Sequence, residues 1–445
     1  MAHADWYRLD NIGKFYSAEA ASSRQTVFRF SAIMTDAVDE NALQRALERT
    51  IERYPSFNVC LRSGLFWHYL EPAKTAVRVQ PETLPVCFGL HTGPHSVLFR
   101  VVWFAERISL EVSHMISDGR GSLRFFRTLM GFYGEERYAT PFEEADHGFD
   151  EERERQAEDS FGRHYDPSKS AATPSERPYR LSGPRDAALP TFLEYHLPAN
   201  EVHAWAKSLG VSVTSLIIAA VICAIRAGMS PAERTRPIRL DVPVDLRQFF
   251  DSATLRNFFG LAFVSYLPGS VDEPLEAIAA NVQQQIASKC TASAMEGRMN
   301  RMIGLEKNVG LRLAPLFLKD LALDAAARIA ERDVTTTVSS LGRIDLPASV
   351  ASHVSGVSVL TATTGLNFIA CTFDNDLCVG ISTVFKRLDV VRELCRLFSA
   401  QGIAGRIDLN HDATEVDRRL REAEFDERLK QLGAKGRKEE HHATL

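Results

Sequence analysis

The sequence lacks the segments that mark secreted, membrane-spanning and nucleic-acid-binding proteins. No positively charged stretch followed by an apolar core stands at its N-terminus, so no secretory signal is predicted. Its longest apolar run, Val211–Ile225, contains serine and threonine and is too short to cross a bilayer. The net charge is -5, without a concentrated basic stretch to attract phosphates. We therefore expect a cytoplasmic protein with no membrane span and no nucleic-acid partner.

Cysteine pairs and glycine-rich loops are also scarce. The seven cysteines include no Cys-x-x-Cys pair and no His/Cys cluster at metal-ligand spacing, which favours reduced core cysteines and no metal. No Gly-x-Ser-x-Gly elbow is present, so a covalent acyl-serine is not expected. Gly119 and Gly121 lack the third glycine of a dinucleotide fingerprint, which excludes a Rossmann site.

The length and composition predict a globular protein with more than one domain. The chain has 445 residues, of which 45% are hydrophobic and 24% charged. Few large apolar side chains occur from 141 to 187, which predicts a polar crossover linker. We expect an N-terminal lobe over 1–140, a C-terminal lobe over 188–410, and a charged helix with a disordered tail over 411–445.

Hydrophobic periodicity predicts alternating strands and helices in both lobes. The predicted strands cover 26–35, 192–196 and 238–242, and the predicted helices cover 39–54, 199–208 and 213–227. One hairpin is expected to turn at Ser63-Gly64, and a second is expected to turn at Glu106-Arg107.

The second hairpin and the helix after it resemble a later part of the chain. Residues 98–104 and 108–114 align with 367–373 and 377–383 at an offset of 269, which is 373 minus 104. Thr383 then stands opposite His114. This similarity favours two related halves with a site at their junction, although any two hairpin-helix units look alike.

His114 and Asp118 are four residues apart where a strand gives way to a helix. Side chains from Ile108 to Val112 alternate apolar and polar, and apolar residues recur at helical spacing after Gly121. Histidine moves protons near neutral pH, and loops on a rigid scaffold often carry catalysis. The residues alone favour a catalytic His114 no more than a histidine that satisfies a backbone group.

Several segments together resemble the chloramphenicol acetyltransferase-like superfamily. Ser-His-Met-Ile-Ser-Asp-Gly at 113–119 is similar to its His-His-x-x-x-Asp-Gly motif, and 241–247 resembles its Pro-Val-x-x-Arg segment. Similar stretches occur at 257–268 and 337–347, the latter like a Ser-Asn-Leu-Gly-Arg segment. The chain is closest to bacterial alcohol acetyltransferases, polyketide-associated acyltransferases and condensation domains. It departs from the pattern at Ser113, which replaces the first histidine, and at Ser340, which replaces the asparagine.

The resemblance implies an α/β (α+β) fold of two similar lobes. Each lobe would have a largely antiparallel or mixed sheet flanked by helices, with a tunnel between the lobes. It implies an acyltransferase that moves an acyl group from a thioester, most simply acetyl-CoA, to a hydroxyl of a small molecule. No permanently bound cofactor is implied. His114 would act as the general base, without a covalent acyl-enzyme.

The resemblance also implies roles for residues around His114. Asp118 would pair with Arg247 to fix the loop, rather than orient His114 as a triad carboxylate, and Gly119 would allow a turn or close approach. Candidate oxyanion or substrate contacts are Asn257, Ser339 and Ser340. Candidate ligands for the phosphates of coenzyme A are Arg298, Arg301 and Lys307, although a solvated helix face explains these cations equally well.

Two other functions remain open at this point. One is a condensation-type enzyme that takes its acyl group from an acyl or peptidyl carrier protein and forms an ester or an amide. The other is a non-catalytic homologue that binds an acyl ligand. A monomer with an alcohol or amine acceptor is expected.

Overall fold

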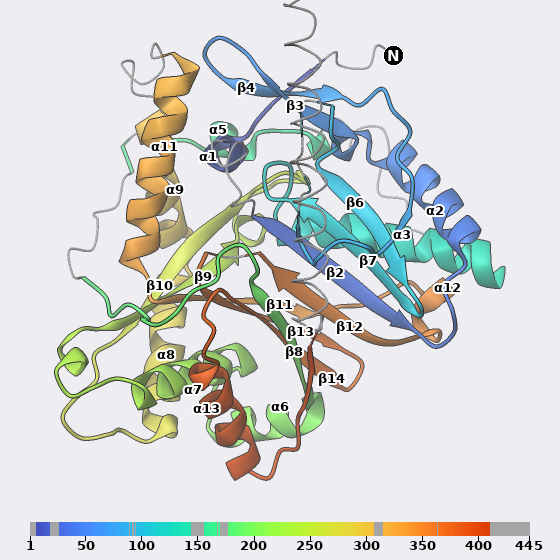
Figure 1. Cartoon of the computed structure of the whole chain (residues 1–445). Helices are drawn as coiled ribbons and strands as arrows, with labels where there is room; N and C mark the ends of the chain where they lie inside the picture. Colours follow the sequence, from blue (N-terminus) through green and yellow to red (C-terminus); the bar gives the residue numbers. More distant parts are fainter. Residues whose placement is uncertain are drawn as a thin grey trace, which may run out of the picture.

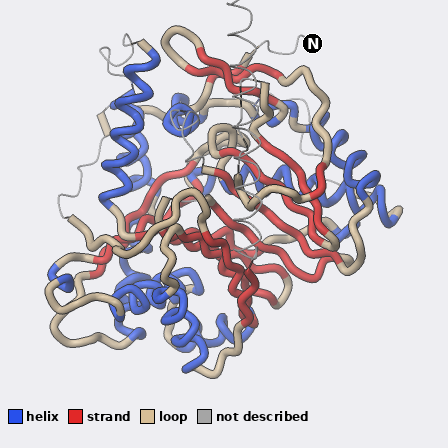
Figure 2. Tube along the Cα trace, in the orientation of Figure 1, coloured by secondary structure: helices blue, strands red, loops and turns tan. Residues whose placement is uncertain are grey.

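The computed structural model describes residues 6–17, 26–88, 90, 93, 95–143, 155–166, 168–169, 177–306, 315–362 and 364–409. The predicted helix and tail of 411–445 lie outside these residues. Figure 1 shows the arrangement of the helices and strands, and Figure 2 shows the strands gathered in the middle of the molecule with helices around them.

The first part of the chain builds a five-stranded sheet and a small three-stranded sheet. Its elements are β1 Tyr7–Arg8, α1 Asn11–Ser17, β2 Val27–Met34, α2 Glu40–Arg53, η1 Pro55–Phe57, β3 Val59–Ser63, β4 His68–Pro72, β5 Gln80–Pro81, β6 Phe99–Phe104, β7 Arg107–Ser113 and α3 Gly119–Tyr138. The five-stranded sheet has the order β12-β2-β7-β6-β5, in which β12 (Val354–Thr361) comes from the second part of the chain, and the small sheet has the order β1-β4-β3.

The second part builds a seven-stranded sheet with the order β10-β9-β11-β13-β14-β8-β15. Its elements are α5 Ser160–Arg163, β8 Thr191–Pro198, α6 Ala199–Ser208, α7 Val213–Ala227, η2 Glu233–Thr235, β9 Ile238–Asp245, η3 Leu246–Gln248, β10 Phe259–Tyr266, α8 Leu275–Lys289, α9 Ala292–Glu306, α11 Leu316–Ala330, η4 Glu331–Asp333, β11 Thr336–Arg343, α12 Ala348–Ala351, β12 Val354–Thr361, β13 Leu366–Phe373, β14 Asp376–Thr383, α13 Asp389–Ala400 and β15 Arg406–Leu409.

The predicted fold class of two α/β lobes is confirmed. In the seven-stranded sheet β11 runs parallel to β9 and β13, and in the five-stranded sheet β5 runs parallel to β6. The other neighbouring strands named here are antiparallel, so both larger sheets are mixed. One strand crosses between the lobes, because β12 from the second part pairs with β2 of the first sheet. The tunnel remains a prediction.

Each larger sheet has its own hydrophobic core. In the first lobe α2 and α3 pack together, and their apolar faces join residues of β2, β6 and β7. In the second lobe α7 packs between α8 and α13, and its side chains are buried from Ser215 to Ile225. The prediction of a buried helix at 213–227 is therefore confirmed. Among the described residues no single helix is long and apolar enough to span a membrane, and α6 with α7 reaches that length only as a pair bent by 85°.

The hairpin repeat recurs in the structure down to its turn. β6 and β7 form one antiparallel hairpin, and β13 and β14 form the other. Ala105 has φ 50° and Asp374 has φ 49°, and these two positions differ by the offset of 269. A positive φ at equivalent non-glycine residues is uncommon, so the two hairpins share their turn conformation.

Three sequence expectations need correction. The second hairpin turns at residues 105–106, one position before the predicted Glu106-Arg107, and the first hairpin turns over 64–67 because β4 begins only at His68. The predicted polar linker of 141–187 also contributes to the core of the second lobe, because the side chains of Phe161 and Tyr179 are buried there. The cysteine prediction is confirmed: all seven are free thiols in described residues, and five of them are buried.

Candidate active site

His114 lies directly after β7, in a short loop that leads into α3. Its backbone N–H donates to the Thr26 carbonyl at 2.9 Å, which continues the pairing of β7 with β2. Asp118 caps α3, because its Oδ1 accepts from the backbone N–H groups of Arg120 at 3.1 Å and Gly121 at 2.9 Å. A carboxylate suits the exposed N–H groups and positive end of a helix. The structure thus has the strand-loop-helix arrangement that the sequence predicted.

A segment of the second lobe, residues 254–258, closes over this loop. Ser117 Oγ donates to the Leu255 carbonyl at 2.6 Å, and the Phe258 N–H donates to Asp118 Oδ2 at 2.8 Å. The loop that carries His114 is therefore fixed by contacts from both lobes.

The close approach of this segment imposes a glycine at position 121. A Cβ on Gly121 would collide with the Leu255 carbonyl, whereas a Cβ on Gly119 would meet only a side-chain methyl of Leu341 at 3.3 Å. Neither glycine has a positive φ. The close approach that was predicted to require Gly119 instead requires Gly121, to which the sequence analysis gave no such role.

We expect Gly121→Ala to be much more destabilising than Gly119→Ala. Alanine at 121 must push α3 away from residues 254–258. Overpacking of this kind lowers the free energy of unfolding by about 1–3 kcal/mol or more. Alanine at 119 needs only a small movement of Leu341. Chemical denaturation of the two variants checks this, and equal losses would contradict the close approach.

Asp118 and Arg247 form a partly buried ion pair between the lobes. Arg247 Nη1 lies 2.9 Å from Asp118 Oδ2 and 2.9 Å from Asp245 Oδ1. Its other nitrogens donate to the carbonyls of Thr254 at 2.9 Å and Arg256 at 2.6 Å. Burial acts to lower the pKa of Arg247, but the carboxylates of Asp118 and Asp245 outweigh it and raise that pKa. Arg247 therefore ties α3 to the segment that closes over His114.

The His114 ring is held by the Asn257 side chain. Asn257 Nδ2 donates to the His114 carbonyl at 3.0 Å and to both carboxylate oxygens of Asp10 at 3.2 Å. Because this atom faces three oxygens, it must be the amide nitrogen, and Oδ1 must be the atom 2.8 Å from His114 Nδ1. Oδ1 can only accept, so Nδ1 carries the proton and Nε2 has a free lone pair. Within the described chain, Nε2 makes no hydrogen bond.

Three aromatic rings surround the imidazole. Tyr16 of α1 stacks on it with ring centroids 4.3 Å apart, Phe28 of β2 lies at 4.6 Å and Phe259 of β10 at 5.4 Å. His114 is only 5% exposed. Burial lowers its pKa from 6.5 to about 4, and the Asp118 charge and the Asn257 hydrogen bond only partly oppose this effect. The ring is therefore a neutral imidazole at neutral pH.

Asp10 is a site residue that the sequence reading missed. Its side chain is fully buried, accepts from the Gly13 N–H at 2.6 Å and is bound by the Asn257 amide. Burial raises its pKa to about 6, which the Gly13 hydrogen bond and the Arg256 charge counteract in part. Nothing in the spacing around Asp10 separates it from a surface aspartate. Asp10 and Asn257 are 247 residues apart in the sequence, and only the tertiary fold brings them together.

The remaining candidates are spread over other parts of the second lobe. Ser339 and Ser340 lie half-buried on β11, and neither hydroxyl hydrogen-bonds His114 among the described contacts. Arg298 donates to the carbonyls of Leu261 at 2.9 Å and Lys289 at 3.3 Å, so it braces α9 against β10. Arg301 is half-buried on α9, and Lys307 lies outside the described residues.

Residues 198–379 match a family described as the C-terminus of phthiocerol/phthiodiolone dimycocerosyl transferase. The fold of the whole chain is similar to that of polyketide synthase associated protein 5 from Mycobacterium tuberculosis, at 12% identity and a TM-score of 0.56 over 88% of this chain and 98% of the other. The chain therefore shares the fold of that protein, and its residues 198–379 are similar to a transferase family.

Two further solved proteins share the fold at similarly low identity. The first condensation domain of the calcium-dependent antibiotic synthetase, solved with a substrate analogue, has 15% identity and a TM-score of 0.59 over 90% of this chain and 97% of the other. TRI101 of F. graminearum, solved with coenzyme A and deoxynivalenol, has 12% identity and a TM-score of 0.61 over 89% of this chain and 97% of the other. No curated protein matches the chain significantly. In this chain, the His-x-x-x-Asp-Gly loop precedes the matched residues 198–379, and Arg247 and Asn257 lie within them.

Proposed function

We propose that the chain is an acyltransferase that moves an acyl group from a thioester such as acetyl-CoA to a hydroxyl of a small molecule. The observation that carries the proposal is the orientation of His114, a neutral imidazole with Nδ1 fixed by Asn257 and no hydrogen bond at Nε2 within the described chain. Support for the thioester donor comes from the similarity of residues 198–379 to a transferase family and from the structure of TRI101 with coenzyme A, whose fold is similar.

In the proposed reaction, Nε2 of His114 takes the proton of the acceptor hydroxyl as its oxygen attacks the thioester carbonyl. The tetrahedral intermediate then expels the thiolate, which receives that proton from Nε2. A positioned base of this kind contributes about 10²- to 10⁴-fold. As His114 becomes an imidazolium, its Nδ1–H bond to Asn257 strengthens, and the nearby Asp118 charge stabilises the cation.

Asn257 is proposed as a positioning residue rather than an oxyanion contact, because its amide protons are directed at Asp10 and the His114 carbonyl. Ser339, Ser340 and backbone N–H groups are then left as candidates for the oxyanion. Arg298, Arg301 and Lys307 are proposed as phosphate contacts for coenzyme A, although the Arg298 guanidinium also donates to backbone carbonyls.

We expect Asn257→Ala to lower kcat by about 10- to 100-fold, the effect of a hydrogen bond to a charged group worth about 1.5–3 kcal/mol. Asp10→Asn, which keeps Asn257, should have a smaller effect. The measurement is kcat and KM with a saturating thioester, together with the pH profile. A purely structural Asn257 would lower stability and leave kcat and its pH dependence unchanged.

The low pKa of His114 predicts activity that persists into mild acid. Since His114 in the free enzyme gains a proton only near pH 4, kcat/KM should stay level from pH 8 to about 5 and decline below that. An inflection of kcat/KM near 6.5, with full recovery on return to pH 7, would contradict this prediction.

The same pKa shift predicts that acid destabilises the fold. The free energy of unfolding should decrease as the pH falls from 6.5 through 4, because unfolding frees His114 to bind a proton.

A panel experiment tests the function. Acetyl-CoA is incubated with the chain and a set of alcohols and amines, and free thiol and acylated product are measured. We expect thiol release that depends on an alcohol. Release that depends on a carrier-bound thioester instead would favour the condensation-type alternative, which the similarity to a condensation domain supports. Acyl binding without turnover would favour a non-catalytic homologue.

A further inference from the structure

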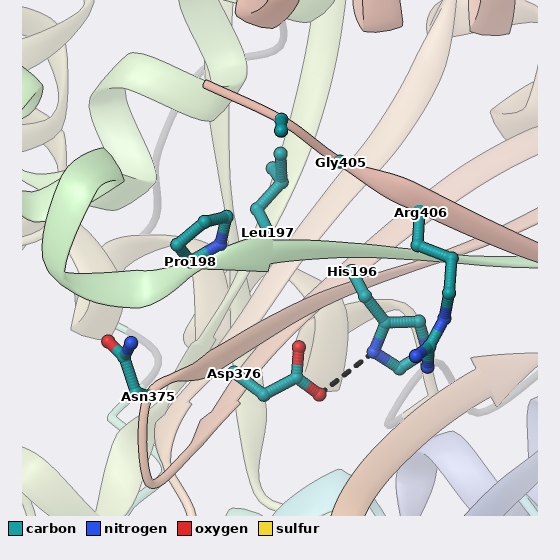
Figure 3. Close-up of a pocket in the computed structure, with 8 residues that line it drawn as sticks. His196, Leu197, Pro198, Asn375, Asp376, Gly405 and Arg406 are labelled. Carbon is teal, nitrogen blue, oxygen red and sulfur yellow. Dashed lines mark hydrogen bonds and ion pairs between the residues drawn. The ribbon is translucent and has the colours of Figure 1, made fainter. Parts of the chain in front are cut away.

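A second cluster of ionisable side chains lies on the seven-stranded sheet at the edge formed by β15, whereas β10 and Phe259 beside His114 lie at the opposite edge. A surface pocket of about 450 Å³ opens here between β8, the β13–β14 turn and residues 404–406 (Figure 3). His196 of β8 lines this pocket, and Asp376 lies beside it.

One ring nitrogen of His196 makes a hydrogen bond, and the other makes none with the described residues. Nδ1 lies 2.8 Å from Asp376 Oδ2, drawn as the dashed line in Figure 3. Because an ionised carboxylate only accepts, Nδ1 carries a proton. Nε2 is buried and hydrogen-bonds no described residue, and the residue as a whole is only 7% exposed. A buried polar atom without a hydrogen bond is unusual in a folded protein, and a bound water or ion would explain it.

Two carboxylates face this nitrogen. Nε2 lies 3.9 Å from Glu194 Oε2 on the same strand and 3.6 Å from Asp408 Oδ2 on β15. The candidate ligand atoms of the three residues all lie within 4.8 Å of one another. Ligands bound tetrahedrally at about 2.0–2.2 Å from one ion stand roughly 3.3–3.6 Å apart, so a small contraction would bring these atoms onto a shared cation.

We propose that His196 Nε2, Glu194 and Asp408 bind a divalent transition-metal cation of the Zn²⁺ class. Imidazole and carboxylate are ligands that such a cation accepts, and three protein ligands beside an open pocket leave a position for water. Asp376 holds His196 as the carboxylate of a carboxylate–histidine–metal triad does, which fixes the tautomer that presents Nε2. The cation would join β15 to β8 at the end of the sheet.

Glu194 remains able to bind a cation despite its other partners. Arg107 donates to Oε1 at 2.8 Å and to Oε2 at 3.0 Å, and the Ser358 hydroxyl donates to Oε1 at 2.5 Å. Each carboxylate oxygen has two acceptor sites, so Oε2 keeps one directed at the cluster. These fixed partners hold the buried carboxylate in place before a cation arrives. Asp408 is paired with Arg406 at 2.9 Å and is 34% exposed, so it is the ligand that can move.

Zinc titration of the full-length chain tests this site. Calorimetry with Zn²⁺ should give one site per chain that is lost in His196→Gln and in Asp408→Asn. Asp376→Asn should weaken binding about 10- to 100-fold, the usual cost of removing an outer partner of a histidine ligand. His203→Ala, at an exposed histidine of α6, is the matched control and should leave binding unchanged.

Asp408→Asn keeps the experiment decisive if His196→Gln fails to fold, because Asp408 is partly exposed at the sheet edge. Co²⁺ should give visible absorption of a low-coordinate site in the wild type only. Equal Zn²⁺ affinity in the wild type and Asp408→Asn would overturn the proposal, as would no binding at all. Without a bound cation, Nε2 would carry a proton directed at Glu194 and Asp408.

Discussion

Replacement of His114 by alanine is expected to lower the rate of acyl transfer by about 10²- to 10⁴-fold, the largest functional effect in the molecule. Without the imidazole, no described group at this position can take the acceptor's proton, because Asn257 and Asp10 are engaged with each other. The loss should appear in kcat, since the ring acts during the chemical step rather than in holding the substrate. Thiol release and product formation at saturating substrate measure it.

The control for this variant must separate chemistry from folding. His114 packs among Tyr16, Phe28 and Phe259, so alanine leaves a cavity and is expected to cost some stability as well. His114→Gln fills more of that space, and His203→Ala removes an exposed histidine from α6. Far-ultraviolet circular dichroism and thermal unfolding report the fold of each variant. Full turnover by a folded His114→Ala protein would remove the proposed mechanism.

Asp118→Asn is expected to lower the free energy of unfolding by about 3–5 kcal/mol, the usual cost of breaking one side of a buried ion pair. The neutral amide leaves the Arg247 charge less compensated, and because its nitrogen cannot accept, either the Phe258 N–H or the N–H groups at the start of α3 lose their acceptor. Activity should also decline, because this pair and cap fix the loop that carries His114. Urea unfolding followed by fluorescence provides the measurement.

An exposed ion pair supplies the matched control. Arg343 and Asp345 lie 3.1 Å apart, but their side chains are 68% and 70% exposed. Asp345→Asn should therefore change the unfolding free energy by less than about 1 kcal/mol. Similar losses in Asp118→Asn and Asp345→Asn would contradict the structural role assigned to Asp118, and an unchanged stability with lost activity would revive the triad interpretation.

Local sequence patterns predicted the scaffold of the site well. Alternation from Ile108 to Val112 and helical spacing after Gly121 placed His114 at the end of a strand and Asp118 in or beside the loop before a helix. The repeat at an offset of 269 predicted a second hairpin, and the structure gives Asp374 the same positive φ as Ala105. These features depend on neighbours within one hairpin or helix, where periodicity is informative.

Contacts between distant segments were harder to predict. Asn257 was singled out as a substrate contact, but its neighbours Asp10 and His114 come from two other parts of the chain. Asp10 gave no signal because a buried aspartate and a surface aspartate read alike in a sequence. The His196 cluster escaped notice for the same reason: Glu194 and Asp408 meet only because β15 pairs with β8. The predicted position of the first hairpin's turn was wrong because several turn lengths fit the same alternation of side chains.

Nitrogen-15 spectroscopy of histidine-labelled protein, with His114→Gln used to assign the resonances, tests the central claim most directly. At pH 7 the account predicts a neutral His114 with its proton on Nδ1 and an unprotonated Nε2, and this state should persist to about pH 5. In Asn257→Ala the preference for that tautomer should weaken. A proton on Nε2 at pH 7, or a His114 already charged there, would contradict the account.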